Sequence, residues 1–141
     1  MKLLACGINH ATADLSVREQ VCFSKDYLAT SLREMRRDTC TEEAIILSTC
    51  NRTEFYCING EAQNIINWLY QYKQLPKDSL RSHWYVYQQE QALRHLLRLA
   101  SGLDSRILGE PQILGQIKTA FSLANSFGTV GSHFNRLFQY I

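Results

Sequence analysis

Residues 44–58 predict a β-hairpin, and this hairpin restricts the fold more than any other feature of the sequence. Residues 44–49, which begin with the apolar run Ala-Ile-Ile-Leu, are predicted to form a strongly apolar strand. Residues 53–58 alternate enough to form a second strand, which ends at Asn59-Gly60. The few residues between the two runs, centred on Cys50 and Asn51, suffice only for a tight turn. The two strands are therefore expected to pair antiparallel.

The patterns around the hairpin predict a split β-α-β-β-α-β order. A first strand is expected over residues 2–8, followed by a helix that Ser16 caps and a second helix that Ser24 caps. A further helix is expected around residues 65–70 and a short last strand over residues 84–87. This order indicates an α+β fold with a ferredoxin-like antiparallel sheet. Helical patterns continue from about residue 89 to the end, so a helical subdomain is expected to follow the sheet.

Composition excludes several classes of protein. A chain of 141 residues is long enough for one domain with a real core. No apolar run approaches the roughly 18 residues that span a bilayer, and the N-terminal apolar stretch is too short for a signal peptide. We therefore expect a cytoplasmic protein with no membrane contact. Five cysteines, an odd number without a CxxC pair, argue against a disulfide framework and a zinc site, and no metal site is predicted.

Charge is distributed unevenly along the chain. Residues 1–70 carry seven Lys or Arg against nine Asp or Glu, whereas residues 71–141 carry eight against four. A basic second half suits a polyanionic partner, although a solvated helix surface explains the same excess equally well. The last apolar pattern (Phe134, Leu137, Phe138, Ile141) is still running at the final residue, which suggests a fragment of a longer protein.

Cys50 is the first candidate for chemistry. It lies at the end of a predicted strand, two positions from Arg52. The thiolate is the reactive form of cysteine, and a guanidinium that is always charged can favour the thiolate or clamp a carboxylate. The alternative is a small buried residue at a strand end, since free cysteines are among the most buried residue types.

Two further features could contribute to a site. His95 falls at the edge of the apolar arc of the predicted helix over residues 89–101, as either a half-buried proton-transfer group or a packed boundary histidine. Residues 101–116 carry three glycines and many polar side chains before a helix, which fits either a polar-ligand site or a well-capped turn. The chain has no GxGxxG and no P-loop sequence, so it lacks a nucleotide cradle of its own.

Three motifs resemble the N-terminal catalytic domain of the glutamyl-tRNA reductases. They are Gly7-Ile8-Asn9-His10-x-Thr12, Ser48-Thr49-Cys50-Asn51-Arg52-Thr53-Glu54, and Ser101-Gly102-Leu103-Asp104-Ser105-x-x-Leu108-Gly109-Glu110-Pro111-Gln112-Ile113-Leu114-Gly115-Gln116. The third motif is long and distinctive, and the three occur in the family's order across nearly the whole chain, so residues 1–141 are interpreted as that domain.

The resemblance implies a reaction and a set of site residues. Cys50 would attack the ester of glutamyl-tRNA and form a thioester, which NADPH reduces to glutamate-1-semialdehyde in tetrapyrrole biosynthesis. His95 would be the second catalytic residue, as a general acid to the leaving ribose hydroxyl or in positioning the tRNA end. Arg52 suits bidentate pairing with the carboxylate of the glutamate side chain. The residues implied to bind the substrate are Thr49, Asn51, Arg52, Ser105, Glu110, Pro111, Gln112 and Gln116.

The resemblance also implies what this chain lacks. The family binds NADPH in a separate domain and forms a homodimer through a C-terminal domain, and both domains are absent here, so no cofactor-binding residues are expected. A hand-off of product to glutamate-1-semialdehyde aminomutase is a further implied partnership. The chain departs from the family where Ala11 and Asp14 replace the usual Lys and Pro, and where Arg106 replaces an apolar residue.

Two other functions remain open from the sequence. A thioesterase or acyl-transfer enzyme built on Cys50 would need no cofactor. A non-catalytic RNA-binding module would use the sheet as its platform, with exposed aromatic residues on two central strands, but the Lys/Arg-Gly-Phe type of motif that this requires is absent.

Overall fold

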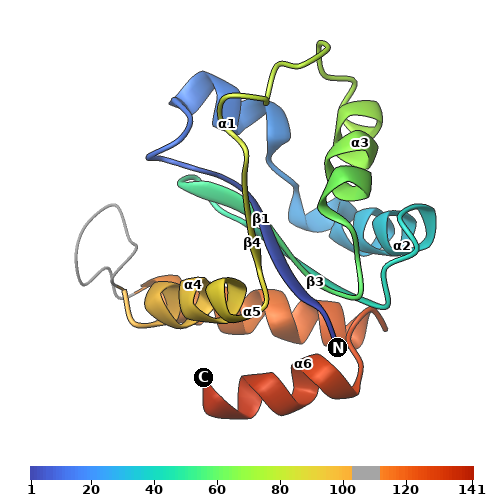
Figure 1. The fold of residues 1–141 in the computed structure, drawn as a ribbon, viewed down its shortest axis with the longest axis vertical. Helices are drawn as coiled ribbons and strands as arrows, with labels where there is room; N and C mark the ends of the chain where they lie inside the picture. The colour runs from blue at the N-terminus through green and yellow to red at the C-terminus, as the bar shows by residue number, and fades with distance from the viewer. Residues whose placement is uncertain (103–111) are drawn as a thin grey trace.

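An antiparallel sheet forms the centre of the protein (Figure 1). The structure is a computed structural model, and it describes residues 1–102 and 112–141. Within these residues the sheet has the strands β1 (Leu3–Asn9), β2 (Glu43–Ser48), β3 (Arg52–Ile58) and β4 (Tyr85–Gln88). Their spatial order is β2-β3-β1-β4, and every neighbouring pair is antiparallel. This arrangement confirms the predicted ferredoxin-like α+β fold.

Helices cover both faces of the sheet. Figure 1 shows α1, α2 and α3 on one side, α4 and α5 on the other, and α6 outside α5. No helix among the described residues has the length and apolar character needed to cross a bilayer. The helical elements are α1 (Leu15–Val21), the 3-10 turn η1 (Lys25–Tyr27), α2 (Leu28–Asp38), α3 (Ala62–Tyr72), α4 (Glu90–Ala100), α5 (Gln112–Ser126), α6 (Ser132–Leu137) and the 3-10 turn η2 (Phe138–Tyr140).

The two central strands, β1 and β3, are buried along their whole length. Alternate side chains of β3 point to opposite faces, as strand geometry requires. Phe55 packs edge-on against Trp68 of α3 with ring centroids 6.5 Å apart, whereas Tyr56 faces His95 of α4. Because both faces of these strands are covered, the sheet presents no open aromatic platform for RNA in the described part of the chain.

The hairpin between β2 and β3 forms as predicted. Ser48 pairs with Thr53 as the last rung of the ladder, and the N–H of Thr49 donates to the carbonyl of Arg52 at 2.8 Å. Inside the turn, the hydroxyl of Thr49 accepts a hydrogen bond from the N–H of Asn51 at 3.1 Å. These contacts close a tight turn that holds Cys50 at its tip.

The start of the first helix differs from the prediction. Asp14, not Ser16, caps α1: its Oδ1 accepts hydrogen bonds from the N–H of Val17 at 3.1 Å and from the Ser16 hydroxyl at 2.8 Å. The bonds from Val17 and Ser16 lower the pKa of the Asp14 carboxyl. A carboxylate two residues earlier is an equally good cap, and it starts the helix at Leu15. Ser24 caps η1, which leads into α2.

We predict that Gly7→Ala strongly destabilises the domain. A Cβ at position 7 would lie 2.2 Å from the carbonyl oxygen of Thr53 and 2.8 Å from the Cα of Glu54, so the backbone of β1 or β3 would have to move. We expect a loss of roughly 2 kcal/mol or more in the free energy of unfolding, measured by urea denaturation. Gly115→Ala is the matched control, because a Cβ there meets no atom within 4 Å and alanine favours a helix. Equal stability of the two variants would contradict this view of the β1–β3 pair.

Candidate active site at the hairpin turn

Cys50 is exposed at the tip of the β2–β3 turn. Its carbonyl oxygen accepts a hydrogen bond from Nε of Arg18 at 3.2 Å, which ties helix α1 to the turn. Cys6 and Cys57, in contrast, are buried, and burial raises the pKa of the Cys57 thiol to about 12. Burial likewise raises the pKa of Cys6. A thiol that is to meet a large substrate must be accessible, and Cys50 satisfies that requirement.

A buried carboxylate, Glu54, lies two residues beyond Arg52 on the same face of β3. Its Oε2 lies 2.5 Å from Nε2 of His95 and 2.5 Å from the hydroxyl of Tyr85, and its Oε1 accepts the hydroxyl of Tyr56 at 2.8 Å. Nη1 of Arg52 lies 3.6 Å from Oε2, as an ion pair longer than a bidentate bond. The side chains of Arg52 and Glu54 are 1% and 0% exposed. The network therefore connects helix α4 to the strand that leaves the Cys50 turn.

The charge of Glu54 depends on these partners. Burial alone would raise the pKa of its carboxyl, but the hydrogen bond and charge of His95, the charge of Arg52 and the hydroxyl of Tyr85 together lower it. Glu54 is therefore ionised at neutral pH. Burial and the adjacent Glu54 charge raise the pKa of Tyr56, which keeps that hydroxyl a donor. Since an ionised carboxylate only accepts hydrogen bonds, Nε2 of His95 carries the donated proton.

Aromatic rings hold His95 in place. Its ring stacks on Tyr87 with centroids 4.8 Å apart and an interplanar angle of 28°, and Tyr56 and Tyr85 lie within 6.5 Å. The side chain of His95 is 8% exposed, so it is more buried than its place at the edge of the apolar arc predicted. Both its position and the proton on Nε2 are thus fixed by neighbours.

Two hollows meet at the residues that precede Cys50. The first, of about 560 Å³, is lined by Thr49 and by Gln112 and Gln116 of α5, among others. The second, of about 350 Å³, is lined by Cys50 together with Arg18 and other residues of α1. Both hollows include Phe23, Ser48 and Thr49 in their walls. A substrate at this junction would contact the thiol and the two glutamines from adjacent sides.

The predicted site residues in the described part of the chain fall into two groups, one at the turn and the start of α5 and one in the buried network between β3 and α4. Thr49, Gln112 and Gln116 share a cavity, Asn51 lies in the turn beside Cys50, and Glu54 joins Arg52 to His95. Ser105, Glu110 and Pro111 lie outside the described residues.

The sequence interpretation did not assign roles to Glu54, Tyr56 and Tyr85. One signal for the first two was available. Positions 52, 54 and 56 share one face of a strand, and an acidic residue within an otherwise buried strand needs partners.

Comparisons with known proteins agree on one family. The family model described as "Glutamyl-tRNAGlu reductase, N-terminal domain" matches residues 6–141. Curated proteins named glutamyl-tRNA reductase are 50% identical in Shewanella amazonensis, over 139 residues, and 50% identical in Stutzerimonas stutzeri, over 141 residues. Each match covers 99% of this chain but 33% of the relative, so the chain spans about a third of their length. The solved glutamyl-tRNA reductase from Methanopyrus kandleri superposes with a TM-score of 0.75 at 28% identity, over 97% of this chain and 31% of that one.

The lowered pKa of Glu54 predicts a specific dependence of stability on pH. The ionised carboxylate stabilises the fold above its ordinary pKa of 4.5, and this contribution is lost as the pH falls through the lower pKa of the folded state. Glu54→Gln should cost about 3 kcal/mol at pH 7, because it removes a buried negative charge that lies 3.6 Å from the Arg52 guanidinium and accepts hydrogen bonds from His95 and Tyr85, and much less in acid. Urea denaturation across pH measures this difference. Glu61→Gln, which removes an exposed carboxylate paired with Lys2, should cost under about 1 kcal/mol. Equal losses for the two variants at pH 7 would contradict the assignment.

Proposed function

The chain belongs to the glutamyl-tRNA reductase family as its N-terminal domain, and on this premise we propose that Cys50 attacks the aminoacyl ester of glutamyl-tRNA. One observation carries the proposal: the exposed thiol lies at the tip of a rigid turn whose following strand holds the buried Arg52–Glu54–His95 network. The turn exposes Cys50, and the strand that begins two residues later carries Arg52 and the carboxylate that orients the His95 imidazole.

The proposed step is an acyl transfer. The sulfur of Cys50 forms a bond to the ester carbonyl carbon, and the bond from that carbon to the terminal ribose oxygen breaks. The ribose oxygen takes up a proton and the tRNA leaves. The product is a thioester between the glutamate α-carboxyl carbon and Cys50, which accepts hydride more readily than the ester did.

Arg52 is proposed to recognise the side-chain carboxylate of the substrate. The side chain of Arg52 is 1% exposed, and in such surroundings a guanidinium pairs strongly with a carboxylate. Its planar fork suits bidentate recognition of the substrate carboxylate better than a lysine would. Thr49, Asn51, Gln112 and Gln116 are proposed to add hydrogen bonds around the glutamyl group. Ser105, Glu110 and Pro111, which lie outside the described residues, are proposed as substrate-binding residues on the family resemblance.

His95 is proposed to assist departure of the tRNA. The hydrogen bond from Nε2 to Glu54 fixes the ring and its tautomer, as the carboxylate of a catalytic triad does for its histidine. In the proposed step the imidazolium form gives the proton on its other ring nitrogen to the leaving ribose oxygen, while Nε2 keeps its own proton and Glu54 balances the positive charge of the ring. The same arrangement also supports the alternative role, in which the ring positions the terminal nucleotide.

The tRNA itself is proposed to approach along α4. The side chains of Arg94 and Arg98 are exposed there, and with Tyr87, Gln91 and His95 they line a hollow of about 280 Å³. Phosphates of an acceptor end would be attracted to the two guanidinium groups beside the histidine.

Reduction of the thioester is proposed to belong to a longer protein. The family uses NADPH as its hydride donor, but the described residues do not fit a nicotinamide cofactor. Their sheet is antiparallel, and none of its strands leads through a glycine-rich turn into a helix. The cofactor-binding domain, the homodimer formed through a C-terminal domain and the hand-off to glutamate-1-semialdehyde aminomutase are proposals for that longer protein, together with its place in tetrapyrrole synthesis.

A second candidate, a thioesterase that releases glutamate, uses the same thiol, and accessibility of Cys50 to water favours it in the isolated domain. The products distinguish the two functions. A reductase gives glutamate-1-semialdehyde when NADPH and the complete protein are present, and a thioesterase gives glutamate in all conditions.

Replacing the nucleophile tests the proposal. Cys50→Ser should lower glutamyl-tRNA turnover by on the order of a thousandfold, because a serine hydroxyl is a much weaker nucleophile at neutral pH. Semialdehyde formation by the full-length protein is the measurement. Cys40→Ser is the matched control, since Cys40 is also exposed but follows α2, away from the turn, and should keep near-normal activity. Near-normal turnover in Cys50→Ser would exclude the mechanism.

The guanidinium geometry of Arg52 is tested separately. Arg52→Lys keeps the positive charge but cannot form two parallel bonds to a carboxylate, so we expect it to lose almost as much activity as Arg52→Ala. Steady-state kinetics with glutamyl-tRNA measures both. If Arg52→Lys keeps nearly full activity, Arg52 acts only through its charge, and recognition of the substrate carboxylate must be assigned elsewhere.

A further inference from the structure

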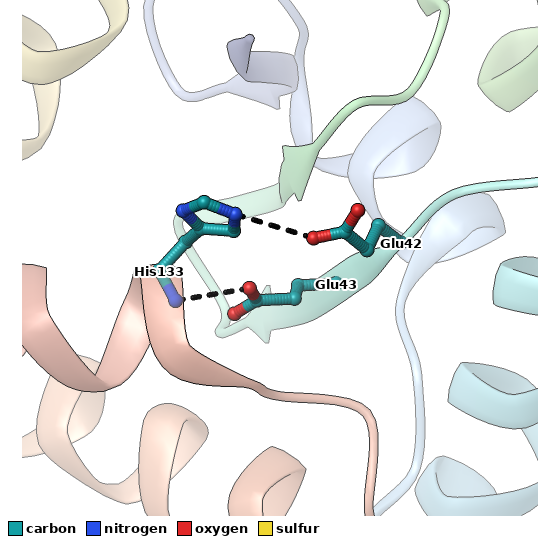
Figure 2. Close-up of side chains that lie close together, drawn as sticks. All are labelled: Glu42, Glu43 and His133. Carbon is teal, nitrogen blue, oxygen red and sulfur yellow. Dashed lines mark hydrogen bonds and ion pairs between the residues drawn. The ribbon is translucent and has the colours of Figure 1, made fainter. Parts of the chain in front are cut away.

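Helix α6 begins against the edge strand β2, where the side chain of Glu43 caps it (Figure 2). Oε1 of Glu43 accepts the N–H groups of Gly131 at 2.7 Å and Phe134 at 3.0 Å, and Oε2 accepts the N–H of His133 at 3.1 Å. Glu43 is 3% exposed. A buried carboxylate that accepts three backbone hydrogen bonds is a strong, directional anchor.

The neighbouring Glu42 contacts the ring of the same histidine. Its Oε2 lies 3.3 Å from Nε2 of His133, so one residue of α6 is held through its backbone by Glu43 and through its ring by Glu42 (Figure 2). Ligand atoms of these three side chains lie within 4.8 Å of one another. We assign no metal to the cluster, because the carboxylate of Glu43 already accepts three hydrogen bonds.

Contacts before and after this anchor fix the direction of α6. The N–H of Ala44 donates to the carbonyl of Thr129 at 2.8 Å, and the Thr129 hydroxyl donates to the carbonyl of Ala44 at 2.9 Å. Beyond the anchor, Phe134 is fully buried, and Phe138 stacks on Phe121 of α5 with centroids 4.3 Å apart. The segment is therefore attached to β2 at its start and to α5 through the ring of Phe138, just beyond the last residue of α6.

Strand β2 connects the anchor of α6 to the turn that holds Cys50. Its first residue, Glu43, anchors α6, and its last residue, Ser48, leads directly into that turn. We propose that Glu43 is a positioning residue: it sets the direction of α6 relative to Cys50, and with it the direction of the protein that follows. The inference rests on the proposed function, in which the hydride donor belongs to that following part. The direction of α6 relative to Cys50 then matters for reduction of the thioester but not for its formation.

The test separates these two steps in the full-length protein. Glu43→Gln keeps the shape of the side chain but replaces one acceptor oxygen by an NH2 group. That group would face backbone N–H groups, which need an acceptor. We expect single-turnover acylation of Cys50 by glutamyl-tRNA to stay within about twofold of wild type. Semialdehyde formation should fall tenfold or more, with free glutamate from hydrolysis rising in its place. Hydrogen exchange at residues 131–134 should accelerate, which reports on the anchor independently of turnover.

Two further variants guard against a simple loss of folding. Gly131→Ala places a Cβ 3.2 Å from Cδ and Oε2 of Glu43, displacing the carboxylate without changing its chemistry, and should shift the products the same way. Glu61→Gln, the same substitution at an exposed carboxylate that pairs with Lys2, should leave the product ratio unchanged.

Two results would overturn the inference: a parallel fall of acylation and reduction in Glu43→Gln and Gly131→Ala, or an unchanged product ratio in both. A wild-type protein that forms no adduct on Cys50 would instead overturn the proposed function, and this inference with it.

Discussion

The carboxylate of Glu54 has no contact with solvent, and the face of the sheet beneath α4 is arranged around it. Four side chains meet it: Arg52, His95, Tyr56 and Tyr85. A buried negative charge without such partners would cost more free energy than a domain of this size can tolerate. The partners in turn owe their positions to the charge, because it fixes the proton of the imidazole and holds the guanidinium on the strand that leaves the Cys50 turn. Stability and the proposed chemistry therefore depend on the same group.

The pairing of the strands sets the position of the Glu54 carboxylate. Gly7 is the cross-strand neighbour of Glu54 on one side and of Tyr85 on the other. Because glycine has no side chain, the hydroxyl of Tyr85 reaches across the central strand to Glu54. The strand β3 therefore carries Arg52 and Glu54 on the face toward α4, while Phe55 packs into the aromatic core on the opposite face. Because successive side chains of β3 point to opposite faces, this one strand contributes to both the aromatic core and the candidate site.

Local patterns predict the hairpin, a cysteine in its turn and the β-α-β-β-α-β order, because strand period and turn composition are contained in a few adjacent residues. The exposure of Cys50, which the sequence left open, comes from the structure. The sequence pattern predicts Ser16 as the cap of α1, whereas Asp14 is the cap, since both residues are good caps and sequence does not choose between starts two residues apart. Glu54 was missed as a site residue because its partners His95 and Tyr85 lie 41 and 31 positions away. The anchor at Glu43 spans 88 positions to Gly131 and depends on tertiary structure in the same way.

The central claim is that the thiol at the tip of this turn takes the glutamyl group from its tRNA. Intact-mass spectrometry of the protein after brief mixing with glutamyl-tRNA, without NADPH, tests it most directly. The account predicts a mass increase equal to one glutamyl group, mapped by peptide analysis to Cys50 and lost on treatment with hydroxylamine, which cleaves thioesters. Deacylation of the tRNA with no adduct at any time, or an adduct on Cys22 or Cys40, would contradict it.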